Sequence, residues 1–241
     1  MRTHARVTDG FSSEGIRAVT YGLVLLGLVL SLVGAHTGRA GEREDTAITL
    51  AFPKAEAYGT VHVEAVIAAS PEVVWVVLTD VDRWRGWMPL VMRAQFFSAA
   101  ATTAIPTGVT KDRALFTELL DQHPGTAGAP SMHGVTPRTT FEAYDLPWPI
   151  KNEWVVRHYT YDASQAAKHR FRATWRKAWG DGQPEGYWEI SPHGDAVTAS
   201  RLVYHYRVKA KRGLALGLFK AGVKRASRQL VEAIRREALR R

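Results

Sequence analysis

The chain has 241 residues, 46% of them hydrophobic and 23% charged, which excludes a wholly disordered protein. It contains no cysteine, which excludes disulfides, thiolate catalysis and cysteine-ligated metal sites. The formal net charge of +9 lies almost entirely in residues 211–241, where ten Lys or Arg stand against Glu232 and Glu237. Because the remaining chain is nearly neutral, we expect one basic C-terminal face and no nucleic-acid partner.

The N-terminal region carries an uncharged run from Ala18 to Ala35, which follows Arg2, Arg6 and Arg17 and leads into small residues. A charged start, an apolar middle and a small-residue exit are typical of a secretory signal peptide. The run also reaches the lower limit for an uncleaved membrane anchor, and a buried soluble helix is the third interpretation. Because positive charge precedes the run, either of the first two places the following domain in the periplasm or outside the cell. We assign residues 1–40 to this signal peptide or inner-membrane anchor.

Residues 41–58 are mixed in character and weakly patterned, so we expect a linker there. A single domain is then expected over residues 59–241, a length that supports one hydrophobic core. From Gly59 to Ala69 apolar residues alternate with polar ones. This alternation predicts the first strand of the domain.

Two short helices are expected after this strand. Ser70 can cap a helix whose first position is Pro71, and this helix should run to about Val81. A second helical piece is expected to follow through Trp84 and Trp87. The Met88-Pro89 pair then ends it.

The chain beyond Pro89 is dominated by predicted strands separated by turn residues. The strands are expected at residues 92–99, 112–120, 138–144, 151–161, 168–175, 186–190 and 197–208. Residues 122–137 are rich in Gly and Pro, and we expect a loop. Asp181-Gly182 and Gly194-Asp195 are typical of hairpin turns.

A long amphipathic helix is predicted over residues 213–241, because apolar residues recur at spacings of three and four. The apolar stripe consists of Leu216, Phe219, Val223, Ala226, Leu230 and Ile234. The opposite side is basic and carries Lys220, Lys224, Arg228, Arg235 and Arg236. This basic surface is either simply solvated or docks on a membrane of anionic lipid.

The element order predicts an α+β fold in which one long helix covers the apolar face of an antiparallel sheet. Two local motifs add to this order. Residues 61–89 (VHVEAVIAASPEVVWVVLTDVDRWRGWMP) combine a strand, a Pro-capped helix with a central Trp, and an Asp-x-x-x-Trp segment before Met-Pro. Residues 146–150 read Leu-Pro-Trp-Pro-Ile. Together they resemble the START-like (SRPBCC) superfamily, in particular its polyketide-cyclase and coenzyme-Q-binding-like branch, over residues 59–238.

The resemblance implies a helix-grip fold, with six or seven curved antiparallel strands wrapped around the terminal helix over a deep apolar cavity. Members bind or transfer lipids, quinones, sterols or polyketides, and a minority catalyse cyclisation or hydrolysis. The chain departs from the family where START domains usually carry an Arg-Asp pair, since Asn152 is followed by Glu153 and Trp154. Arg157 is a candidate for the place of that arginine.

Aromatic residues on alternating strands are candidates to line such a cavity, although the same rings can simply form the core. The candidate lining residues are Trp84, Trp87, Trp154, His158, Phe171, Trp175, Tyr204, Tyr206, Phe219 and Val223. We identify no catalytic residue, metal site or cofactor, because no motif with nucleophile, phosphate-loop or metal-ligand spacing is present.

Three functions follow as hypotheses. The first is a non-enzymatic binder or carrier of a hydrophobic small molecule, such as a lipid or quinone, at or near a membrane surface. The second is a polyketide cyclase/aromatase-like or hydrolytic enzyme on the same fold, which requires polar groups converging inside the cavity. The third is a protein-interaction module whose cavity is filled by side chains.

Overall fold

The structure is a computed structural model, and it describes residues 46–53, 58–97, 113–122, 130–145, 153–180, 184–209 and 216–241. The predicted signal or anchor segment, the Leu-Pro-Trp-Pro-Ile motif and the Asp181-Gly182 turn lie outside the described residues. Among the helices that are described, none combines the length and the hydropathy needed to cross a membrane.

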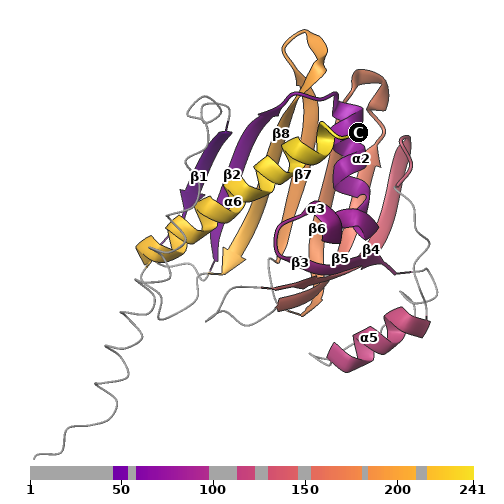
Figure 1. Ribbon diagram of the computed structural model, residues 1–241, viewed down its shortest axis with the longest axis vertical. Coiled ribbons are helices and arrows are strands. Elements are labelled where there is room, and N and C mark those ends of the chain that lie inside the picture. The colour runs from indigo at the N-terminus through magenta and orange to yellow at the C-terminus, as the bar shows by residue number, and fades with distance from the viewer. Residues whose placement is uncertain are drawn as a thin grey trace, which may run out of the picture. The chain divides into compact units, whose positions relative to one another are not determined.

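An eight-stranded antiparallel sheet forms the body of the domain (Figure 1). The strands are β1 (Thr46–Ala51), β2 (Tyr58–Ile67), β3 (Val91–Phe96), β4 (Gly134–Tyr144), β5 (Glu153–Ala163), β6 (Phe171–Gly180), β7 (Glu185–His193) and β8 (Ala196–Lys209). Their order across the sheet is β1-β2-β8-β7-β6-β5-β4-β3. This is the predicted α+β architecture, in which the last strand, β8, lies between β2 and β7.

Strand β1 corrects the expected linker over residues 41–58. Ile48 and Leu50 are half-buried and pack against the core, while Ala47 and Thr49 between them are exposed. This period of two is the alternation expected of an edge strand with one covered face. The sheet therefore has eight strands, where six or seven were expected.

The helix after β2 begins as predicted. The Ser70 hydroxyl accepts a hydrogen bond from the Val73 N–H at 3.4 Å, and Pro71 occupies the first turn of α2 (Pro71–Thr79). A short 3-10 turn, η1 (Val81–Arg83), and one helical turn, α3 (Trp84–Trp87), follow. Trp75 and Trp84 are both buried, so this helical segment contributes two indole rings to the core.

The segment expected as a strand over residues 112–120 is instead helix α5 (Arg113–Gln122). Its apolar residues, at 115, 116, 119 and 120, recur at the three- and four-residue spacings of a helix, not at every second position. The expected loop over residues 122–137 is also shorter than predicted, because β4 already begins at Gly134.

The terminal helix α6 (Leu216–Ala238) crosses one face of the sheet and shares that face with α2 and α3 (Figure 1). Its buried residues are Ser227, Val231, Ala233, Ile234 and Ala238. Of the predicted stripe, Phe219, Val223 and Leu230 are half-buried, whereas Leu216 and Ala226 are exposed. The apolar stripe was thus predicted in the right helix but begins later along it.

Candidate functional site

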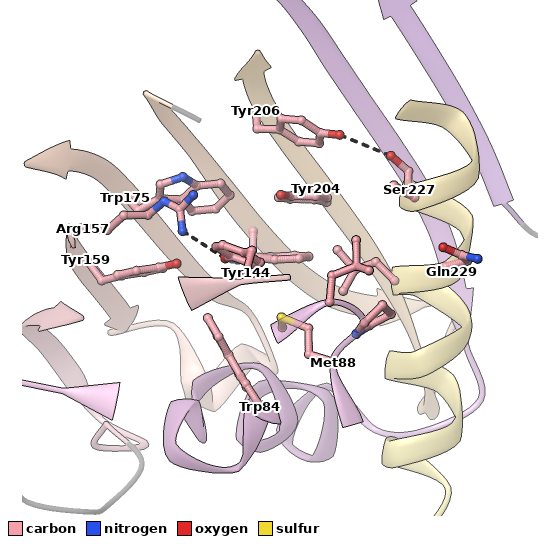
Figure 2. Close-up of a pocket in the computed structure, with 15 residues that line it drawn as sticks. Trp84, Met88, Tyr144, Arg157, Tyr159, Trp175, Tyr204, Tyr206, Ser227 and Gln229 are labelled. Carbon is pink, nitrogen blue, oxygen red and sulfur yellow. Dashed lines mark hydrogen bonds between the residues drawn. The ribbon is translucent and has the colours of Figure 1, made fainter. Parts of the chain in front are cut away.

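A cavity of about 220 Å³ lies between α6, the segment that joins α3 to β3, and the inner face of strands β4 to β8 (Figure 2). Its lining residues come from five strands and two helical segments. They are Trp84, Met88, Pro89, Leu90, Tyr144, Arg157, Tyr159, Trp175, Trp188, Tyr204, Tyr206, Ala226, Ser227, Gln229 and Leu230. The cavity therefore sits where a helix-grip fold leaves room between the terminal helix and the curved sheet.

One side of the cavity is an aromatic wall made of Trp175, Trp188, Tyr204 and Tyr206. Trp188 and Tyr204 are cross-strand partners on β7 and β8, and their ring centroids lie 3.8 Å apart with planes 9° from parallel. Tyr206 stacks on Tyr204 at 4.6 Å, and Trp175 lies 5.6 Å from it. The four rings therefore form one continuous aromatic surface along this side of the cavity.

A glycine makes room for this wall. A Cβ atom at Gly186 on β7 would collide with the Trp175 ring and with the His205 backbone carbonyl. The missing side chain lets the Trp175 indole lie flat over its cross-strand partner Gly186. The position of the Trp175 ring at the cavity therefore depends on Gly186, which the sequence pattern predicted only as the first residue of a strand.

At the β4–β5 end of the cavity lies a polar cluster consisting of Thr140, Glu142, Tyr144, Arg157 and Tyr159. Tyr159 and Thr140 each donate a hydrogen bond to Glu142 Oε1, at 3.0 and 2.9 Å. The Tyr144 hydroxyl and Arg157 Nη1 both donate to Glu142 Oε2. Four donors thus converge on one carboxylate, which satisfies both of its oxygens in a buried place.

Arg157 is the member of the polar cluster with hydrogen-bonding capacity left. Its side chain is only 4% exposed, and its Nη1 also donates to the Tyr144 hydroxyl at 3.2 Å (Figure 2). Its Nε has no partner among the residues that the structure describes. Burial raises the pKa of the neighbouring Tyr159 phenol, which therefore stays neutral. The cluster consequently places one fixed positive charge beside the cavity.

The rim of the cavity is formed by Met88, Pro89 and Leu90 on one side and by α6 on the other. Leu90 has a φ of 65° and is 43% exposed. A leucine in the left-handed region is strained by about 1–2 kcal/mol. Its carbonyl accepts a hydrogen bond from the Asp145 N–H at 2.8 Å, which fixes the rim segment to the end of β4.

On the α6 side, the Ser227 hydroxyl lies 3.4 Å from the Tyr206 hydroxyl (Figure 2). This contact joins the terminal helix to the aromatic wall inside the cavity. Arg235 adds a second polar link between α6 and the sheet, because it donates two hydrogen bonds to the Val66 carbonyl. Apolar packing of Val231 and Ile234 in the core also holds the helix on the sheet.

Four of the ten candidate lining residues line this cavity, namely Trp84, Trp175, Tyr204 and Tyr206. Two others pack elsewhere in the core: Phe171 stacks on Trp75 at 5.2 Å, and Trp87, the last residue of α3, is half-buried against the core. Whether the four residues contact a ligand stays a prediction.

Trp154 and His158 require a correction, because both lie on the opposite face of the sheet. Trp154 packs there against Phe141, with ring centroids 6.3 Å apart. His158 Nδ1 lies 3.0 Å from the Thr139 hydroxyl on the same face. Since side chains alternate along a strand, the inward positions of β5 belong to its odd-numbered neighbours, which include Arg157.

Phe219 and Val223 also lie away from the cavity, because the first turns of α6 project past its rim. Phe219 packs edge-on against Phe52, with centroids 5.5 Å apart. Val223 is half-buried against the core. The lining of the cavity by α6 begins one turn later, at Ala226.

Two important residues of the site were not predicted, namely Tyr144, which lines the cavity, and Glu142, which lies in the polar cluster behind it. Glu142 lies between Phe141 and Ala143, and a solvent-facing acidic residue would give the same alternation, so the sequence pattern alone does not place it in the core. Its burial in the structure requires a charged partner. Arg157, named only as a substitute for the family arginine, is that partner.

The basic surface is present on α6 with one correction. Lys224, Arg228 and Arg236 are exposed. Lys220 is half-buried, and its ammonium group lies 5.7 Å from the centre of the Phe52 ring. Arg235 points inward and donates to the Val66 carbonyl at 2.9 Å, so it does not belong to the exposed basic face.

In the part of the chain that the structure describes, no group of three or more acidic or histidine side chains is placed to hold a metal ion. The sequence model for "polyketide cyclase / dehydrase and lipid transport" proteins matches residues 58–239. The chain belongs to this family. Its START-like character is therefore shown, and the match begins at β2 and ends in the last turn of α6. Comparison with curated proteins returns no match.

Solved structures confirm the fold. The STAR-related lipid transfer protein from Xanthomonas axonopodis is similar with a TM-score of 0.55 and 16% identity, over 83% of this chain and 96% of that one. Human StAR-related lipid transfer protein 5 gives 0.55 and 8% identity, over 93% and 97%. The human StarD13 lipid transfer and protein localization domain gives 0.53 and 14%, over 89% and 95%. At these identities the likeness shows the START helix-grip fold alone.

Proposed function

We propose that this protein binds a hydrophobic small molecule in the cavity under α6 and carries it without changing it chemically. The observation that carries the proposal is a cavity that combines an aromatic wall with one buried arginine at its end. Mostly apolar walls with a few placed polar groups are what small-molecule sites have in common. Membership of a family that includes lipid transport, and likeness to proteins named for lipid transfer, support the proposal.

The enzymatic alternative stays open, because the cavity contains polar groups. We favour binding over catalysis for a geometric reason. The Glu142 carboxylate accepts hydrogen bonds on both oxygens, including a charged one from Arg157, so no lone pair is directed at a bound molecule. A general base needs its acceptor within reach of the substrate proton. Burial also raises the pKa of Tyr159, so the phenolate that could act as a base does not form near neutral pH.

We further propose that the exposed basic face of α6 docks on an anionic membrane surface. Lys224, Arg228 and Arg236 are exposed on the helix that also closes the cavity. Leu218 is 47% exposed on the same helix. Each basic residue near an anionic surface contributes about 1 kcal/mol, and an exposed leucine can enter the interface. The uncharged run at 18–35 supports an exported or anchored protein, in which such a surface is close by.

A cavity-blocking substitution tests the binding function. Ala226 on α6 is exposed at the edge of the cavity, so Ala226→Trp should place an indole across its entrance. Ala221 is an exposed alanine on the same helix that does not line the cavity, and Ala221→Trp is the matched control. We expect the full chain and the control variant to take up an environment-sensitive apolar dye, and Ala226→Trp to lose this uptake.

Two results would count against the proposal. If Ala226→Trp binds the dye as well as the control, the binding site is not this cavity. If the unmodified chain takes up no dye and no extracted lipid, the cavity does not bind small molecules. The protein-interaction module would then explain the domain better than the carrier function. Circular dichroism of both variants shows whether each is folded, which separates loss of binding from loss of structure.

A further inference from the structure

We infer that His62 and His205 form a binding site for a divalent late transition metal ion, such as Zn²⁺, Cu²⁺ or Ni²⁺. The site goes beyond the proposed function, because both histidines lie on the outer face of the sheet, opposite to α6 and its cavity. Three features lead to it: the pairing of two imidazoles across neighbouring strands, a carboxylate that orients one of them, and ring nitrogens without a partner among the described residues.

The sheet places the two imidazoles opposite each other. His62 on β2 and His205 on β8 are cross-strand partners. Their ring centroids lie 5.9 Å apart, and the ring planes are at 58° to each other. Metal–nitrogen bonds to zinc measure about 2.0–2.1 Å, and each nitrogen lies about 1 Å from its ring centre, so two imidazoles that share one ion have centres up to about 6 Å apart. The observed separation therefore lets one ion bind a nitrogen of each ring.

Glu64 fixes the tautomer of His62. The His62 Nε2 lies 2.9 Å from Glu64 Oε1, and since an ionised carboxylate only accepts hydrogen bonds, Nε2 carries the proton. Arg201 donates to the other Glu64 oxygen at 2.8 Å, which holds the carboxylate in place. A neutral His62 therefore keeps its lone pair on Nδ1. Metal-binding histidines usually donate their other ring N–H to a carboxylate in this way.

His205 is positioned by ring stacking, not by hydrogen bonds. Its ring stacks on the Tyr187 ring at 5.1 Å with planes 19° apart, and the Arg172 guanidinium lies 4.8 Å from the centre of the Tyr187 ring. Neither ring nitrogen of His205 has a hydrogen-bond partner in the part of the chain that the structure describes. Both histidines are only half-buried, so an ion can reach them from solvent.

The surrounding charges favour a metal that binds imidazole over one that binds carboxylate. Glu64 is paired with Arg201, and Glu185 is paired with Arg207 at 2.9 Å, so the nearby acidic groups are neutralised. Imidazole suits zinc, copper and nickel, whereas magnesium and calcium prefer oxygen ligands. The described residues place no third acidic or histidine side chain at the pair, so water completes the coordination of the ion.

Calorimetric titration of the untagged full chain with Cu²⁺, Zn²⁺ and Mg²⁺ tests the inference. We expect one site that binds Cu²⁺ more tightly than Zn²⁺ and does not bind Mg²⁺. His62→Gln and His205→Gln should each weaken this site at least about tenfold, and Glu64→Gln should weaken it by about tenfold through the orientation of His62. The matched control is His158→Gln, which changes a histidine on the same face that contacts the Thr139 hydroxyl, and it should leave the affinity unchanged.

Electron paramagnetic resonance of the unmodified chain with one equivalent of Cu²⁺ gives a readout that needs no variant, and we expect the hyperfine pattern of two imidazole nitrogens. A pattern from a single nitrogen would overturn the site. Equal affinities of the His205→Gln and His158→Gln variants would also overturn it, because the ion would then bind elsewhere on the chain. Absence of Cu²⁺ and Zn²⁺ binding would overturn this inference and leave the carrier function standing, since neither histidine lines the cavity.

Discussion

Arg157 on β5 and Glu142 on β4 form an ion pair at one end of the cavity, and their side chains are 4% and 0% exposed. Burying two charges is unfavourable unless each is paired and hydrogen-bonded. Here Thr140, Tyr144 and Tyr159 complete the coordination of the carboxylate. The pair therefore combines a structural role with a fixed positive charge that faces the cavity.

Glu142→Gln should lower the free energy of unfolding by about 3–5 kcal/mol, because it leaves the Arg157 charge buried without a counter-charge. The measurement is urea denaturation followed by circular dichroism. The control is Glu189→Gln, which breaks the surface pair of Glu189 with Arg172, whose side chains are 43% and 50% exposed. That change should lower stability by less than about 1 kcal/mol. Equal losses in the two variants would mean that the buried pair contributes no more than a surface one.

The link between Tyr206 and Ser227 gives a second prediction. Tyr206→Phe removes the hydroxyl that lies 3.4 Å from Ser227, and should lower stability by about 0.5–1.5 kcal/mol and speed amide hydrogen exchange in α6. The control is Tyr161→Phe, since the buried Tyr161 hydroxyl has no partner among the described residues. Removing that hydroxyl should leave stability unchanged or raise it. Faster exchange in α6 with both variants would show that the contact to Ser227 is not the cause.

The main features of the fold could be predicted, because they depend on local chemistry. Ser70 and Pro71 predicted the start of α2, and the alternation in residues 197–208 predicted β8. The type of secondary structure was predicted wrongly at α5, where the apolar spacing is helical but was interpreted as strand alternation. It was also predicted wrongly at β1, because a six-residue edge strand carries too few apolar residues to be distinguished from a linker.

The site could be predicted only in part, because it depends on which residues of each strand face inward and on which strands pair with each other. The faces of β6 and β8 were assigned correctly, which gave Trp175, Tyr204 and Tyr206. On β5 the assignment was displaced by one residue, which exchanged Trp154 and His158 for their inward neighbours. The union of Glu142 with Arg157 depends on the register between β4 and β5, and no local pattern in the sequence contains it.

Alkaline pH should destabilise the fold through two buried phenols. Burial raises the pKa values of Tyr159 and Tyr161 above the ordinary value near 10. The unfolded chain therefore loses these protons first, so the stability they contribute is present in full below about pH 10 and is lost above it. Each phenol contributes a slope of about 1.4 kcal/mol per pH unit in that range.

The check is an alkaline titration that follows tyrosinate absorbance and circular dichroism together. Tyr161→Phe removes one of the two titrating phenols, so the free energy of unfolding should fall less steeply with pH above about pH 10. Ionisation of both phenols in a chain that keeps its native circular dichroism would contradict the burial of their hydroxyls.

Membrane docking by α6 predicts binding that depends on lipid charge and on salt. The full chain should sediment with vesicles that contain phosphatidylserine and less with vesicles of phosphatidylcholine alone, and added salt should weaken the difference. Replacing Lys224, Arg228 and Arg236 by Ser should reduce the charge-dependent part by about 3 kcal/mol. The matched control replaces Arg172, Arg201 and Arg207, which lie in ion pairs on strands of the sheet. Equal losses from the two triple variants would point to net charge, not to α6.

The central claim is that the cavity under α6 holds a hydrophobic small molecule, and native mass spectrometry of the full chain, purified from its membrane context, tests it most directly. The account predicts a mass excess from one bound apolar molecule, at near-stoichiometric occupancy, that organic extraction releases and that Ala226→Trp abolishes. A bare protein mass, together with no uptake of any apolar molecule offered afterwards, would contradict it.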